Sequence, residues 1–159
     1  MRRALMTVAA VTTIGIALVM IGASQRVSGH CQVPCGVFDD EARLKGMLED
    51  TTTIAKAIDQ ITELSKGHTA LDINQAVRWI DTKDYHSSQI IETASVYFLL
   101  QRVKPVEPGA DGYREYLQKL AAHHAVMVAA MKTKQMVDPE TAKALQAAIN
   151  NMAKYYHSD

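Results

Sequence analysis

The sequence predicts an all-α protein, an up-down-up-down four-helix bundle preceded by an irregular N-terminal segment. Three observations predict it. Glycine and proline are scarce, at 8 and 4 of 159 residues, and aromatic residues make up only 6% of the chain, which favours helices over sheets. Apolar residues recur at helical spacing in four segments after residue 39. The links between these segments are short, which makes consecutive helices antiparallel neighbours.

The first 29 residues are predicted to form a cleavable leader. Two arginines precede an uncharged run over residues 4–23, and a polar stretch follows it. This order is that of a secretory signal peptide, with Val27 and Gly29 as the small residues before the cut. A processing peptidase would thus expose His30 and the mature protein would be exported, to the periplasm or outside the cell. The run also approaches the length that spans a bilayer, so a membrane anchor is the alternative.

Four helices are predicted, and their ends differ in how clearly the sequence marks them. They run from residue 40 to 66, from Asp72 to about Arg102, from Asp111 to the polar stretch 132–135, and from Pro139 onward. The fourth has the clearest start, with Asp138 as N-cap and Pro139 in the first helical position. Asp39 and Asp40 stand where an N-cap of the first helix would. Asp72 and Gln75 have the spacing of a capping box for the second. The predicted domains are the leader 1–29, a metal-binding hook 30–38 and a bundle 39–159.

Each predicted helix has an apolar face expected to lie in the core. The residues on these faces are Leu44, Leu48, Thr51, Ile54, Ile58 and Ile61; Ile73, Val77, Ile80, Ile91, Ala94 and Phe98; Tyr116, Leu117, Leu120, His124, Val128 and Met131; and Leu145, Ala148, Ile149, Met152 and Tyr156. The histidines of the body lack the spacing of bundle metal sites, so we interpret them as surface or hydrogen-bonded core residues. They are His68, His86, His123, His124 and His157.

The charge balance excludes one class of function. Lys and Arg together number 17, as do Asp and Glu, and three of the arginines lie in the leader. The mature chain would therefore be weakly acidic, which argues against a nucleic-acid-binding protein, whose phosphate contacts call for a basic face.

Both cysteines of the chain lie in the short stretch HCQVPCG, which follows the predicted cut. Pro34 and Gly36 predict a backbone turn within it, because glycine permits a turn that other residues resist. The side chains of His30, Cys31 and Cys35 form a compact set of soft ligands, suited to zinc, copper or nickel. Cleavage would add the free amine of His30 and bring the amide nitrogen of Cys31 within reach of the same metal. Nitrogen and sulfur donors in a plane suit nickel(II), and thiolates also stabilise the oxidised ion. A small disulfide or a zinc clip is the alternative for an exported protein.

The stretch HCQVPCGVF resembles the HCxxPCGxY nickel hook of the nickel superoxide dismutases, and NQAVRWI and YFLLQRVKP are also similar to members of that family. The resemblance implies disproportionation of superoxide to oxygen and hydrogen peroxide by a Ni(II)/Ni(III) centre. It implies that the His30 amine, the Cys31 amide nitrogen and the sulfurs of Cys31 and Cys35 form a square base, with the His30 imidazole as axial ligand. It further implies one nickel ion per subunit and a homohexamer.

Two departures from the family pattern concern residues around the hook. Phe38 stands where the family has a tyrosine, and a phenyl ring cannot hydrogen-bond a bound anion. We count Phe38 with the three metal ligands as a candidate catalytic residue. The residue that would hold the axial imidazole in place is not assigned: Glu41 or Glu49 could accept its hydrogen bond, or Arg78 could take part.

Some positively charged residues follow the predicted hook or lie on the second helix, and two other functions fit the same N-terminal ligands or cysteines. Arg43, Lys45 and Arg78 are candidates for steering superoxide, or simply part of a solvated face. The alternatives to the enzyme are a metal-binding or metal-transfer protein that uses the same N-terminal ligands, and a membrane-tethered thiol-disulfide switch.

Overall fold

The computed structural model describes residues 32 and 34–156, so the predicted leader, His30 and Cys31 lie outside the described residues. The chain divides into residues 1–33 and a unit from Pro34 to Asp159, and the fold below is that of the second unit. Its helices are α2 (Asp40–Leu64), α3 (Ala70–Glu92), η1 (Thr93–Arg102), α4 (Tyr113–Gln135) and α5 (Pro139–Ala153). Among the described residues there is no strand. In that same part of the chain, no helix has the length and apolar character needed to cross a membrane.

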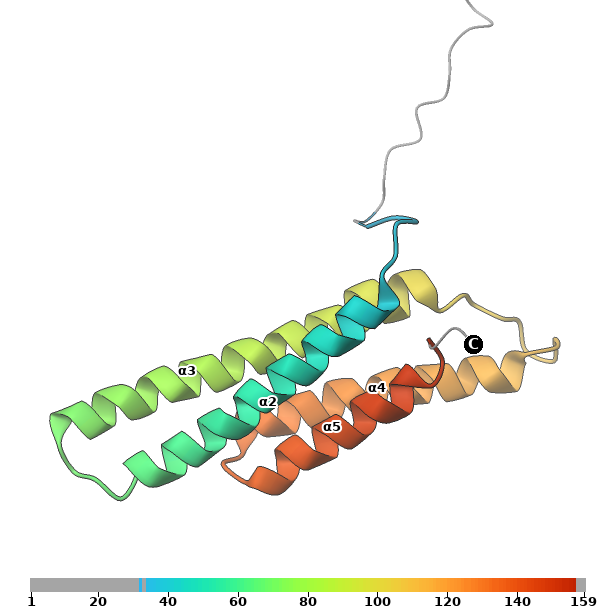
Figure 1. Cartoon of the computed structure of the whole chain (residues 1–159). Helices are drawn as coiled ribbons and strands as arrows, with labels where there is room; N and C mark the ends of the chain where they lie inside the picture. The colour runs from blue at the N-terminus through green and yellow to red at the C-terminus, as the bar shows by residue number, and fades with distance from the viewer. Residues whose placement is uncertain (1–31, 33, 157–159) are drawn as a thin grey trace, which may run out of the picture. The chain divides into compact units, whose positions relative to one another are not determined.

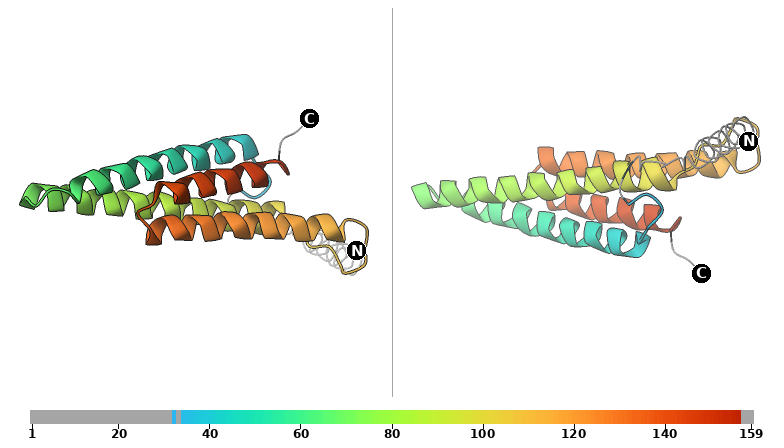
Figure 2. Two further views of the ribbon diagram at one scale, coloured as in Figure 1. Left: turned by 90° about the horizontal axis from the view of Figure 1, so that it is seen from below. Right: turned by 90° about the horizontal axis from the view of Figure 1, so that it is seen from above.

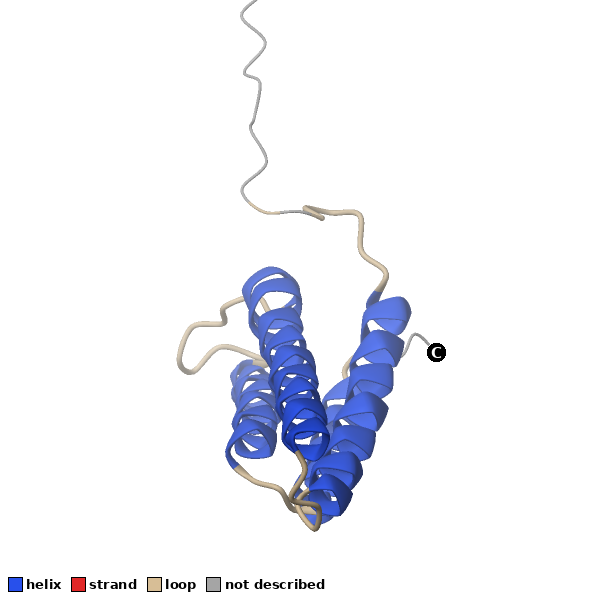
Figure 3. Ribbon diagram, turned by 90° about the vertical axis from the view of Figure 1, so that its left-hand side faces the viewer, coloured by secondary structure: helices blue, strands red, loops and turns tan. Residues whose placement is uncertain are grey.

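The helices form the predicted four-helix bundle. Each helix packs against its neighbour in the chain, and α5 closes the ring by packing against α2. Figure 1 shows the four helices running alternately up and down, and Figure 3 shows them around a common axis. The all-α prediction is therefore confirmed.

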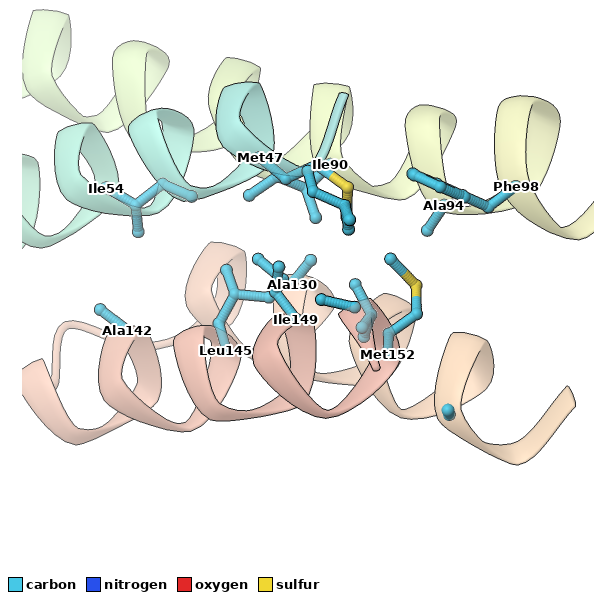
Figure 4. Close-up of a cluster of buried hydrophobic side chains, with 14 of the residues drawn as sticks. Met47, Ile54, Ile90, Ala94, Phe98, Ala130, Ala142, Leu145, Ile149 and Met152 are labelled. Carbon is cyan, nitrogen blue, oxygen red and sulfur yellow. The ribbon is translucent and has the colours of Figure 1, made fainter. Parts of the chain in front are cut away.

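One core of aliphatic, methionine and aromatic side chains lies between the two helical pairs. Figure 4 shows Met47, Ile54 and Ile90 facing Leu145 and Ile149 across the bundle, and all five are at most 1% exposed. The methionines Met47 and Met152 belong to this core, and Met152 was predicted to lie there. Burial of these apolar faces is the main source of stability for such a bundle.

The N-caps of α2 and α5 are the residues that the sequence predicts, whereas the N-cap of α3 is a different residue. The Asp39 carboxylate accepts a hydrogen bond from the amide of Ala42 at 2.9 Å, and Asp138 caps α5 ahead of Pro139. The capping box predicted for Asp72 and Gln75 is wrong, because Thr69 is the cap and Asp72 is its partner. Thr69 and Asp72 have the same three-residue spacing as Asp72 and Gln75, and they form the capping box in the structure.

The last part of the second predicted helix departs from α geometry. Residues Thr93–Arg102 form a π-helix, η1, continuous with α3. A π-helix closes hydrogen bonds between residues five apart, so such residues lie one above the other. Phe98 and Val103 still follow that spacing at the end of η1, where the Val103 amide donates to the Phe98 carbonyl at 3.2 Å.

The first half of α3 extends past the ends of α4 and α5, as Figure 2 shows. The Nζ of Lys83 contacts the last carbonyls of α4, so α3 residues before this point have no α4 beside them. The predicted core residues Ile73, Val77 and Ile80 are consequently 62%, 51% and 41% exposed. Their assignment to the core is wrong because an apolar helical stripe does not reveal where the opposing helix ends.

The predicted core face of α4 is also wrong. Leu117, Val128 and Met131 are exposed, and so is His124. The buried face instead carries small or polar side chains, namely Ala122, His123, Val126, Ala130 and Thr133. Because α4 has apolar residues on both sides, periodicity did not distinguish the two faces.

His123 is a hydrogen-bonded core residue, as the sequence predicts. Its Nδ1 lies 2.6 Å from the Lys119 carbonyl oxygen, so Nδ1 carries the proton and Nε2 accepts from the Tyr156 hydroxyl at 2.7 Å. Burial lowers the pKa of His123, against the opposing effect of its bond to Lys119. Burial also raises the pKa of Tyr156. The pair is therefore neutral in the folded protein.

We expect His123 to make the bundle less stable in mild acid. The folded protein keeps the imidazole neutral, whereas the unfolded chain takes up a proton below its ordinary pKa of about 6.5. This contribution to the free energy of unfolding is present above pH 6.5 and is lost as the pH falls through the lowered pKa. Urea unfolding between pH 7.5 and 5 checks it. His123→Gln should show a flatter pH dependence than the parent, and parallel curves would contradict the assignment.

Candidate metal centre at the N-terminal end of the bundle

Cys35 lies in a tight turn just before α2. The Val37 amide donates to the Pro34 carbonyl at 3.1 Å, and Cys35 and Gly36 have φ of 31° and 91°. Both central residues of this turn are thus in the left-handed region, which glycine adopts freely and other residues adopt at a cost of about 1 kcal/mol or more. The turn predicted at Gly36 is confirmed, and a strained non-glycine residue at its centre indicates a functional constraint.

A glutamine of η1 contacts the backbone of this turn. The Cys35 amide donates to Oε1 of Gln101 at 3.3 Å. The other end of the same side chain is fixed, because its Nε2 donates to the Val96 carbonyl at 3.1 Å. Gln101 is 9% exposed. It therefore joins the end of η1 to the residue that bears the thiol.

Asp40, the first residue of α2, is the centre of a polar cluster that also contains Tyr97 and Arg102. The Arg102 guanidinium donates to both carboxylate oxygens, with Nη2 to Oδ2 at 2.6 Å and Nε to Oδ1 at 3.0 Å. The Tyr97 hydroxyl donates to Oδ1 at 2.9 Å. Tyr97 and Arg102 are five residues apart, so the π-helical register brings both to one carboxylate. In an α-helix, residues five apart are not neighbours.

The pKa values of two members of this cluster, Tyr97 and Arg102, are raised. Burial and the bond to Asp40 raise the pKa of Tyr97 to about 12, so its hydroxyl remains a donor. The bond to Asp40 also raises the pKa of Arg102. The Arg43 guanidinium lies 5.2 Å from the centre of the Tyr97 ring. Two arginines therefore lie at the hook end of the bundle.

Phe38 packs onto the same cluster. Its ring lies edge to face with Tyr97 at 5.7 Å, and the Arg102 guanidinium lies 4.6 Å from its centre. Such contacts hold an aromatic ring and a cation in place. The structure thus brings Phe38 and Cys35 to the same end of the bundle.

Other candidates from the sequence lie elsewhere. Trp79 stacks with Lys56 at 5.7 Å, which places its neighbour Arg78 beside the middle of α2, about 24 Å along the helix from Asp40. Glu41 and Glu49 are exposed on α2. The structure therefore does not bring Arg78 to Cys35 and Phe38, and the arginine that contacts Phe38 is Arg102.

The donor chemistry at this end fits a soft metal. Cys35 is a free, half-buried thiol, and a thiolate is the ligand that nickel, copper and zinc share. No group of three metal-ligating side chains occurs among the described residues. His30 and Cys31, the other ligands predicted from the sequence, lie outside the described residues.

Comparison with protein families identifies the chain. Residues 25–159 match the family model described as nickel-containing superoxide dismutase. The chain belongs to this family. It is an oxidoreductase that acts on superoxide with a nickel cofactor. The match spans the hook sequence and the helices α2, α3, η1, α4 and α5 of this superoxide dismutase, whereas no curated protein and no solved structure matches it.

The sequence did not reveal which polar residues of the dismutase lie beside Cys35 and Phe38. Three of them, Tyr97, Gln101 and Arg102, are far from Cys35 in the sequence. The fourth, Asp40, was interpreted only as a helix cap. A signal was present, because three of them fall within YFLLQRVKP, one of the segments similar to the family. The contacts themselves depend on the π-helical register, which the residue pattern did not predict.

Proposed function

We propose that this superoxide dismutase binds one nickel ion per subunit through His30, Cys31 and Cys35, with His30 as the N-terminal residue. The observation that carries the proposal is Cys35, a free thiol in a strained turn fixed to the bundle. The matching family model, which begins before the hook sequence, supports the same ligands. When bound, nickel supplies a one-electron Ni(II)/Ni(III) couple able both to oxidise and to reduce superoxide.

The chain's own residues hold this end of the protein in a defined geometry. Gln101 binds the backbone of Cys35, and Asp40 ties the start of α2 to η1 through Arg102 and Tyr97. The guanidinium group of Arg43 adds positive charge that attracts an anionic substrate, whereas the charge of Arg102 is balanced by the Asp40 carboxylate. In the overall reaction, two superoxide ions and two protons give one oxygen and one hydrogen peroxide.

We further propose a homo-oligomer, for which the family resemblance implies a hexamer. The stripe of Ile73, Val77 and Ile80 on the protruding half of α3 supports this, because it exposes apolar side chains that a subunit interface would cover. Removal of the leader 1–29 by a peptidase and export of the mature protein are also proposed. They are supported by the order of charged, apolar and small residues in the leader.

Metal content and activity measured on the same samples test the proposed function. Mature protein beginning at His30 should bind one nickel ion per chain, and dismutase activity should be proportional to nickel content. Removing the metal with a chelator should abolish activity, and nickel alone should restore it. Protein that holds zinc or copper and shows no dismutation would instead indicate a metal-transfer function. An intact leader together with a Cys31–Cys35 disulfide would indicate the membrane-tethered switch.

Phe38→Tyr tests the part played by the ring that departs from the family pattern. We expect the hydroxyl to change the rate of dismutation or the inhibition by peroxide while nickel content stays the same, because tyrosine can hydrogen-bond an anion and phenylalanine cannot. Pulse radiolysis of the two nickel-loaded proteins measures the rates. Tyr113→Phe, on the N-terminal turn of α4, is the matched control. Identical kinetics would exclude a role for position 38.

A further inference from the structure

We propose that Gln101 is a positioning residue, which holds Cys35 in its strained turn and so presets the sulfur for nickel. The inference rests on the proposed function of Cys35 as a nickel ligand. It adds a residue 66 positions away in the sequence to the machinery of the hook.

One orientation of the Gln101 amide satisfies its contacts with Cys35 and Val96. Its Oε1 faces the Cys35 N–H at 3.3 Å, and its Nε2 faces the Val96 carbonyl at 3.1 Å. Rotating the amide by half a turn would place two donors together at Cys35 and two acceptors together at Val96. The side chain is also 9% exposed, so water competes little for either bond. The bundle therefore offers the hook a fixed acceptor.

The π-helical register explains why this acceptor points at the hook. Residues five apart are stacked in η1, so Gln101 lies over Val96, whose carbonyl orients it, and Arg102 lies over Tyr97. Gln101 contacts Cys35 within the turn, and Arg102 contacts Phe38 and Asp40, which follow the turn in the chain. The segment 35–40 is thus held at both ends by consecutive residues of one helix. π-Helical segments of this kind are frequent at functional sites.

The energetic consequence is preorganisation of a metal ligand. The positive φ of Cys35 is unfavourable for a residue with a side chain, so without a partner the turn would populate other conformations. Nickel binding would then have to order the backbone as well as form bonds, which weakens apparent affinity. Residues that orient metal ligands in this way typically contribute about 10- to 100-fold in affinity.

Two substitutions separate positioning from simple support of the helix. Gln101→Glu keeps an acceptor for the Cys35 amide but loses the donor to Val96, whereas Gln101→Met removes both at similar length. We expect Gln101→Met to weaken nickel binding about tenfold, measured by competition with a chelator, and to shift the nickel–thiolate absorption bands. Gln101→Glu should lie between Gln101→Met and the parent in nickel affinity, because it keeps the acceptor for Cys35 but places an oxygen against the Val96 carbonyl. Gln118→Met, on the exposed side of α4, is the matched control.

Hydrogen exchange of the Cys35 amide provides a measurement independent of nickel. In the metal-free chain, Gln101→Met should raise its exchange rate about tenfold, and Gln101→Glu should raise it less. Unchanged exchange and unchanged nickel affinity in Gln101→Met would overturn the inference, as would equal losses in both variants. If the parent protein binds no nickel, the proposed function fails, and the exchange rates still decide whether Gln101 orders the turn.

Discussion

Cys35→Ser should yield a folded protein that has lost its nickel and its dismutase activity. A serine hydroxyl stays protonated at neutral pH and is a poor ligand for a soft ion, whereas a thiolate binds strongly. We expect nickel affinity to fall more than about a hundredfold, beyond the usual effect of altering a supporting residue. Activity should fall with the metal content, because the thiolate is also needed to make the oxidised ion accessible.

The body of the protein should be unaffected by this change. Cys35 is half-buried and lies outside the core, so the urea midpoint should move little. The matched control is Val37→Ser, which introduces the same side chain two residues away at a position 80% exposed. It should retain nickel and activity. A Cys35→Ser protein that still binds one nickel ion per chain would show that another residue supplies this ligand.

Lys83→Met should cause the largest loss of stability among substitutions away from the hook. The Lys83 side chain is 2% exposed, and its Nζ donates to the carbonyls of Thr133 and Lys134, both at 2.7 Å, and to Asp84 at 3.0 Å. These carbonyls belong to the last turn of α4, where a positive charge is favourable. Methionine fills a similar space but leaves the helix end without its cap.

We expect a loss of about 3 kcal/mol in the free energy of unfolding, since hydrogen bonds to charged groups contribute about 1.5–3 kcal/mol each and a buried acceptor is left unpaired. Urea unfolding at fixed protein concentration measures it. Lys132→Met, an exposed lysine of the same turn, should change stability by less than about 0.5 kcal/mol. Equal effects of the two substitutions would show that the buried ammonium does not stabilise the helix end.

The sequence predicted those parts of the fold that depend on local chemistry. Asp39 and Asp138 were identified as caps because N-cap chemistry is read from neighbouring residues. The burial of Ile73 and Val77 was predicted wrongly because it depends on where α4 ends, which is fixed at Lys83 by a contact between distant residues. The four-helix architecture was predictable, but the exact extent of each packed face was not.

The candidate site shows the same division. The thiol of Cys35 and the turn at Gly36 follow from a short motif, and the structure confirms the turn. The contacts of Gln101 and Arg102 with that motif require the π-helical register of η1. An apolar repeat gives little indication of such a register, because the same residues also fit one face of an α-helix. The supporting contacts were therefore accessible only from the structure.

The central claim is that a freed His30 amine joins the Cys35 thiolate in binding nickel. Native mass spectrometry of protein purified from its own cells tests it most directly, because one spectrum gives both the N-terminal residue and the bound metal. We predict a chain that starts at His30 and carries one nickel ion. A chain that starts at any other residue while holding nickel and full activity would contradict the account.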